Sequence, residues 1–142
     1  MFIQEIVYDD GGRAEAGFKG ATGDCVCRAI AIATQKPYKE VYDLINQFGK
    51  KERKEKKSSA RTGVAIQTTR KIMDYLGWEW VPTMGIGTGC KVHLKGDELP
   101  KGRIIAKCSG HVVAVIDGVV HDTYDSTRGG TRCVYGYYRR RG

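Results

Sequence analysis

The 142-residue sequence has no apolar run long enough to cross a membrane, since a spanning helix needs ~18 or more apolar residues in succession. Its first residues, MFIQEIVYDDGG, lack the basic and then apolar segments of a signal peptide. We therefore expect a cytoplasmic protein without membrane attachment. The length favours one domain spanning 1–142.

Cysteine pairs with the spacing of a zinc site are also missing, because no CxxC occurs and Cys25 and Cys27 would point apart on a helix. A metal site is therefore a disfavoured alternative, and we assign no metal and no cofactor. The odd number of cysteines, without a signal peptide, argues against a disulfide framework. At least one thiol is then free for chemistry. The residues such a metal site could draw on are Cys25, Cys27, Cys90, Cys108, Cys133, His93, His111 and His121.

Acidic residues do not balance the basic ones, and the formal net charge is +8. Much of the excess lies in KKERKEKKSSAR at 50–61 and in RRR at 139–141. We interpret these runs as a solvated basic linker and a basic tail at 139–142. Nucleic-acid binding is a weakly supported alternative, because acidic residues interrupt the first run and no aromatic residue within it could stack on bases.

Hydrophobic periodicity predicts helices first and antiparallel strands later, which is typical of an α+β fold. Pro37 opens the second helix and Gly49 ends it, while Gly77 ends the third. Asp117–Gly118 predicts a two-residue hairpin turn. The expected helices cover 23–34, 37–48 and 62–76, and the expected strands cover 1–9, 78–81, 103–107, 111–116, 119–122 and 132–138, with either a short strand or a turn at 91–94.

Cys25 lies in the sequence TGDCVCRAIAIAT, at about the second or third position of the first helix, with Thr22 as the N-cap. The free N–H groups and the macrodipole of a helix N-terminus favour negative charge, so this position lowers a thiol pKa. The same N–H groups could hold an oxyanion. Cys27 should instead point inward and pack in the core.

A base for such a thiol is offered by His111, at the start of the strand HVVAVI. The predicted turn pairs Ile116 with Val119 and places Asp122 diagonally opposite His111 on the same face. Asp122 could then orient the imidazole. Asp125 is the weaker candidate, because alternation puts it on the other face.

This order of Cys, His and Asp, with Cys on a helix and the other two on neighbouring strands, resembles the papain-like cysteine peptidase superfamily. GDCVCRAIAIAT, PYKEVYDLI and GHVVAVIDGVVHDTYD are similar to small papain-fold proteins of phages and bacteria. The resemblance implies N-terminal helices packed on a C-terminal antiparallel sheet. It also implies Cys25 as the nucleophile, His111 as general base and then acid, and Asp122 as the orienting residue.

The superfamily often has a glutamine shortly before the nucleophile, whereas this chain has FKGATGDC. The oxyanion role could fall to the Cys25 N–H, Thr22 or Gln4.

We expect a cysteine hydrolase (peptidase, isopeptidase or amidase) that forms an acyl-thioester with a protein or peptide, in a bacterial or phage-infected cell. Trp78, Trp80 and the loop 82–90 should shape its cleft. The alternative is a noncatalytic papain-fold protein whose basic surfaces bind a host protein or nucleic acid. The sequence leaves the oligomeric state open.

Overall fold

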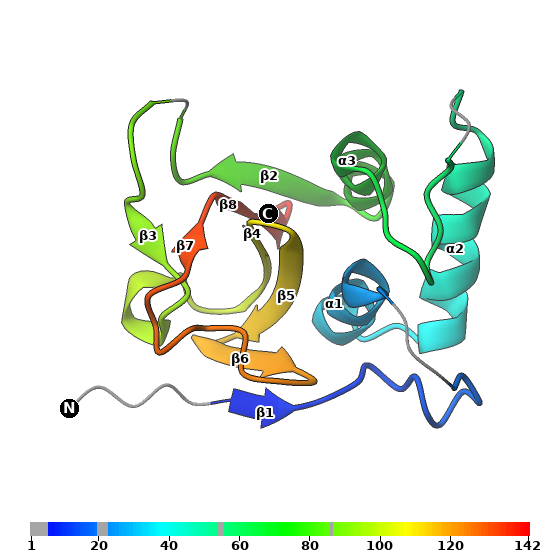
Figure 1. Cartoon of the computed structure of the whole chain (residues 1–142), viewed down its shortest axis with the longest axis horizontal. Helices are drawn as coiled ribbons and strands as arrows, with labels where there is room; N and C mark the ends of the chain where they lie inside the picture. The colour runs from blue at the N-terminus through cyan, green and yellow to red at the C-terminus, as the bar shows by residue number, and fades with distance from the viewer. Residues whose placement is uncertain (1–5, 20–22, 54–55, 86) are drawn as a thin grey trace.

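The computed structural model describes residues 6–19, 23–53, 56–85 and 87–142. Within these ranges the chain forms three helices, a six-stranded sheet and a small two-stranded sheet (Figure 1). The α+β prediction is therefore confirmed. The three helices are α1 (Cys25–Thr34), α2 (Tyr38–Lys50) and α3 (Ile66–Tyr75), and a short 3-10 turn, η1, covers Gly96–Glu98. The strands are β1 (Ile6–Tyr8), β2 (Trp78–Pro82), β3 (Val92–His93), β4 (Arg103–Cys108), β5 (His111–Ile116), β6 (Val119–Asp122), β7 (Cys133–Val134) and β8 (Gly136–Arg140).

The large sheet has the strand order β1-β6-β5-β4-β8-β2, and β3 pairs with β7 in the small sheet. Strand β1 runs parallel to β6, whereas the other pairs in the large sheet are antiparallel. Strands β5 and β6 have the predicted bounds, and Ile116 pairs with Val119 as expected. Asp117 and Gly118 both have positive φ, which is the backbone of the tight hairpin turn their sequence predicts.

The predicted strand at 132–138 is two strands in the structure. Tyr135 lies between them, donating its N–H to the Lys107 carbonyl and accepting a hydrogen bond from the Thr83 N–H. The chain therefore leaves the small sheet after β7 and enters the large sheet at β8. The hydrophobic periodicity of a single segment cannot predict that the chain passes from one sheet to another. The predicted strand at 1–9 is observed only over β1, and its first five residues lie outside the described ranges.

Helix α1 lies across the large sheet, mainly against β5, and α2 packs on its outer side (Figure 1). Its apolar face is buried together with residues of α2 and one face of the sheet, including Ile45, Ile105 and Ala114. The opposite face of the sheet has a second buried cluster that includes Val113, Val115 and Val120. The sheet is thus covered on both faces, which holds the ends of β5 and β6 in place beneath α1.

Two helix boundaries differ from the predictions. Helix α2 continues through Gly49, where the backbone carbonyl of Ser58 packs so closely that a Cβ would collide with it. This glycine therefore serves a close approach and does not end the helix. Helix α3 begins at Ile66 because the preceding residues form a turn in which Ser59 pairs with Gly63.

The segment predicted as a solvated linker at 50–61 is partly fixed to the fold. The Glu52 carboxylate accepts hydrogen bonds from Ser58 and Thr68, and Ala60 is buried. Residues 54–55 lie outside the described ranges. In the part of the chain that the structure describes, no helix combines the length and apolar character that crossing a bilayer requires.

Candidate active site

Helix α1 begins at Cys25, and Asp24 occupies its N-cap. The helix therefore starts two residues later than predicted, and Cys25 is its first residue. The Asp24 side chain makes no capping bond; it is buried, accepts a hydrogen bond from Tyr38 at 2.7 Å and pairs with Arg28. The first N–H groups of a helix have no acceptor within the helix, so those around Cys25 can receive an anion. The predicted N-cap Thr22 and the oxyanion candidate Gln4 lie outside the described residues.

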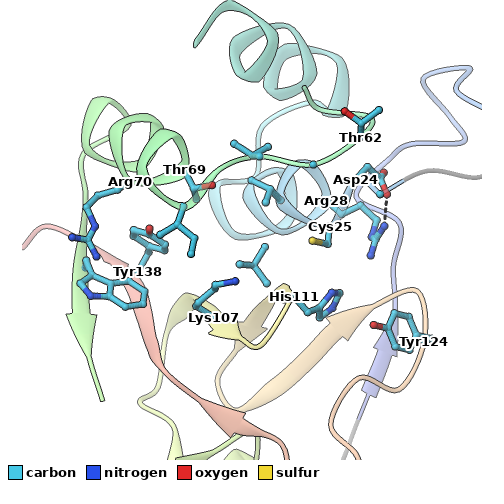
Figure 2. A pocket seen from close by; sticks show the side chains of 18 residues that line it. Asp24, Cys25, Arg28, Thr62, Thr69, Arg70, Lys107, His111, Tyr124 and Tyr138 are labelled. Carbon is cyan, nitrogen blue, oxygen red and sulfur yellow. Dashed lines mark hydrogen bonds and ion pairs between the residues drawn. The ribbon is translucent and has the colours of Figure 1, made fainter. Parts of the chain in front are cut away.

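The structure brings Cys25, His111 and Asp122 together at one end of a cavity. The Cys25 thiol and the His111 ring interact, and each favours the charged form of the other; Figure 2 shows both residues at the same end of the cavity. His111 Nε2 donates to Asp122 Oδ2 at 2.8 Å. Because Asp122 occupies Nε2, Nδ1 is the ring nitrogen left for the sulfur. His111 and Asp122 are 6% and 3% exposed, so water competes little for these bonds.

The surroundings of Cys25 favour its thiolate. Burial by itself raises the pKa of the thiol, but the hydrogen bond with His111, the Val112 N–H and the charge of Arg28 outweigh it, and the net pKa is lowered. Cys27 is the contrasting case on the same helix. It is fully buried as predicted, and burial raises its pKa to about 12.

The surroundings of the imidazole and of the carboxylate favour the charged form of each. Burial lowers the pKa of His111, but its bonds to Asp122 and Cys25 outweigh that effect, so the net pKa is raised. Burial raises the pKa of Asp122, but hydrogen bonds from His111, Ser126 and the Thr123 N–H have the larger effect, so the net pKa is lowered. The arrangement is thus suited to a thiolate–imidazolium pair.

Sequence reasoning missed three residues around this set. Arg28 Nη2 lies 3.2 Å from Asp122 Oδ1, and Arg28 Nη1 pairs with Asp24. Ser126 Oγ donates to Asp122 Oδ2 at 2.7 Å. The Tyr124 ring lies 5.6 Å from that of His111, centroid to centroid, and is exposed. The i, i+4 spacing of Asp24 and Arg28 was a usable signal for one contact.

Asp125, the weaker candidate for the orienting role, bonds instead to the backbone N–H and hydroxyl of Thr127. It belongs to the turn after β6, as the predicted alternation implied.

The cavity next to Cys25 has a volume of about 470 Å³ and lies between the helices and the sheet (Figure 2). Trp80 lines it as predicted, whereas Trp78 does not, and the described residues of the loop 82–90 are absent from its walls. The loop is held elsewhere, because Cys90 forms a disulfide with Cys133. The expectation of no disulfide framework is wrong for this pair, since the pairing of β3 with β7 brings the two cysteines together. Cys25, Cys27 and Cys108 are free thiols.

No group of three or more His, Cys, Asp or Glu residues suited to a metal ion occurs within the described ranges. Comparison with known proteins adds no relative, because no family model, curated protein or solved structure matches the chain.

Proposed function

We propose that this protein is a papain-like cysteine hydrolase that cleaves an amide or isopeptide bond through an acyl-thioester on Cys25. The observation that supports the proposal is that Cys25 and His111 line one cavity and His111 is hydrogen-bonded to the buried Asp122. A buried thiol without a chemical role is ordinarily in the state of Cys27, with a raised pKa. Cys25 has a lowered pKa despite burial, as a nucleophile needs.

The proposed reaction begins when the Cys25 thiolate forms a C–S bond to the substrate carbonyl, whose electron pair moves onto oxygen. N–H groups at the start of α1 stabilise that oxyanion. The C–N bond then breaks, and His111 gives its proton to the leaving nitrogen. Water next attacks the thioester carbonyl while His111 accepts a proton. The C–S bond breaks and the starting thiolate–imidazolium pair is restored.

Asp122 keeps its position throughout the cycle. Its Oδ2 accepts from His111 Nε2, which fixes the tautomer that leaves Nδ1 facing the sulfur. Ser126 and Arg28 hold the carboxylate from two further directions. Asp122 is therefore a positioning residue whose charge also stabilises the imidazolium.

The proposal is tested by limited alkylation with iodoacetamide near neutral pH, followed by peptide mapping. We expect Cys25 to be labelled first, with Cys27 and Cys108 as internal control thiols because burial raises the pKa of both. In His111→Ala protein the labelling rate of Cys25 should fall about tenfold or more, since each unit of pKa changes the thiolate fraction about tenfold.

A second measurement follows cleavage of a fluorogenic peptide library by the native protein and by Cys25→Ala protein. Cleavage that requires Cys25 supports the proposal. Equal labelling of the three free thiols, or cleavage that persists without the Cys25 sulfur, would overturn it.

A further inference from the structure

The cavity beside Cys25 is one half of a longer groove. A second hollow of about 580 Å³ lies against α3, β2 and β8. The two hollows share four lining residues, Ile66, Arg70, Trp80 and Tyr138. The groove therefore runs from the start of α1 past α3 to the outer edge of the sheet. Such a path fits an extended chain better than a compact small molecule.

The junction of the two hollows is an apolar platform. Ile66 is 63% exposed there, at the first turn of α3. The rings of Trp80 and Tyr138 lie 5.0 Å apart, and the Arg70 guanidinium lies 5.3 Å above the Trp80 ring. An exposed aliphatic side chain grouped with aromatic rings marks a surface that binds an apolar group.

The half of the groove next to Cys25 has an excess of positive charge. The Asp24 carboxylate on its wall is buried and paired with Arg28. Lys107, on β4, is half-buried, and its ammonium makes no hydrogen bond or ion pair within the described ranges. Figure 2 shows its side chain pointing into the cavity between Tyr138 and His111. A cation in this position lacks an anionic partner.

The walls of the second hollow carry both signs of charge, with two carboxylates among the cations Arg70, Lys71 and Arg141. Its two carboxylates, Asp74 and Glu79, form ion pairs with Arg141 and Arg139. A polyphosphate backbone following the groove would meet these two carboxylates, whereas the half-buried ammonium of Lys107 suits a single carboxylate. The charge distribution thus favours an acidic peptide over a nucleic acid.

We propose that the groove binds an extended peptide with an acidic side chain near the scissile bond, held by Lys107, and an apolar side chain on the platform of Ile66, Trp80 and Tyr138. This proposal rests on the proposed function, because it names the substrate class of that site. Lys107 would be a specificity-determining residue, since its ammonium distinguishes a carboxylate from the amide of the same shape.

The test measures dissociation constants on Cys25→Ala protein, which retains the groove and cannot cleave. The probes are N-acetylated, alanine-based hexapeptides with one leucine and one glutamate, moved through each pair of positions. Each has a partner with glutamine in place of glutamate. We expect at least one glutamate peptide to bind about tenfold more tightly than its glutamine partner, as a charge-assisted hydrogen bond predicts.

Four further variants locate the effect. Lys107→Met should reduce the preference for glutamate to less than about twofold, and Lys107→Arg should retain most of it, because the cation remains. Lys101→Met, an exposed lysine outside both hollows, should leave the preference unchanged. Ile66→Ser should weaken the binding of the leucine peptides. It should leave the fold intact, since Ile66 is mostly exposed.

Equal affinity for glutamate and glutamine peptides would overturn the proposal, as would a preference that survives Lys107→Met. Tighter binding of a single-stranded oligonucleotide than of every peptide would overturn it in favour of nucleic acid. Because binding is measured without the Cys25 sulfur, this result is independent of whether the native protein cleaves. Absent cleavage together with a Lys107-dependent preference would overturn the proposed hydrolase alone.

Discussion

Arg28 and Asp122 are 94 positions apart in the chain, yet Arg28 Nη2 lies 3.2 Å from Asp122 Oδ1. The contact joins the first turn of α1 to the end of β6, the two elements that hold Cys25 and the partner of His111. The other terminal nitrogen of Arg28, Nη1, pairs with Asp24, so one guanidinium bridges two buried carboxylates. The bridge thus links the helix that carries the thiol to the strand that carries the partner of the imidazole.

Replacement of Arg28 by methionine should therefore cost stability. The substitution removes the pairing of two buried carboxylates, and breaking a buried ion pair from one side typically costs about 3 kcal/mol. We expect a decrease of that order in the free energy of unfolding, measured by urea titration. A matched control is Lys39→Met, which breaks the exposed i, i+4 pair with Asp43 and should change nothing measurable. Equal stability of Arg28→Met and native protein would contradict the bridge.

The His111–Asp122 pair should make stability depend on pH. The raised pKa of His111 gives stability that is complete below about 6.5 and is lost as pH rises through the folded value. The lowered pKa of Asp122 gives stability that is complete above about 3.8 and is lost as pH falls through the folded value. The pair thus stabilises the fold most between these two limits.

We expect the free energy of unfolding to decrease as pH rises above the ordinary His value, and the decrease to be smaller in Asp122→Asn protein. Urea titrations of both proteins across this range would measure it. A steeper decrease in the Asn variant would show that Asp122 does not stabilise the imidazolium.

Gly136 on β8 should not tolerate a side chain. A Cβ there would collide with the indole ring of Trp80 and approach the Val81 carbonyl. Overpacking of this kind costs about 2 kcal/mol, so Gly136→Ala should lower the free energy of unfolding by that order and disturb the near-ultraviolet signal of Trp80. Gly85→Ala is the control, because its Cβ would meet only Thr88 at 3.6 Å. The idea fails if both variants are equally stable.

The Cys90–Cys133 disulfide closes a loop with a sequence separation of 43. Loop-closure entropy predicts that it stabilises the oxidised protein by about 2–4 kcal/mol. We expect Cys90→Ser/Cys133→Ser protein to unfold at lower urea concentration, while iodoacetamide still labels Cys25 at its native rate. Thiol titration of the oxidised, denatured protein should detect the three free cysteines, and detection of all five would refute the pairing.

The sequence was informative about the hairpin that contains His111 and Asp122. The two-residue turn at Asp117–Gly118 specifies how the strands on either side of it pair. That register places Val113, Val115 and Val120 on one face, as the structure has them. The predicted juxtaposition of His111 with Asp122 follows from the same local rules, because the two residues are only 11 positions apart.

The local rules of strand pairing and turn type do not predict contacts between distant segments. The parallel pairing of β1 with β6 and the Cys90–Cys133 pair each join parts of the chain that share no periodic pattern. The predicted start of α3 is wrong because the turn before it is closed by a single β-bridge between Ser59 and Gly63. Such a bridge produces no hydrophobic pattern in the sequence. Gly49 was misread for a related reason, since the carbonyl that packs on it comes from another segment.

The sequence by itself determined the helix that presents Cys25, the hairpin that presents His111 and Asp122, and the order in which they occur, because backbone sterics and side-chain alternation act over a few residues. Only the tertiary structure decided that the thiol meets the imidazole, that Arg28 joins Asp24 to Asp122, and that Lys107 points into the cavity unpaired. Those contacts depend on the packing of α1 against one face of the sheet, where burial and the exclusion of water set the strength of each charge interaction.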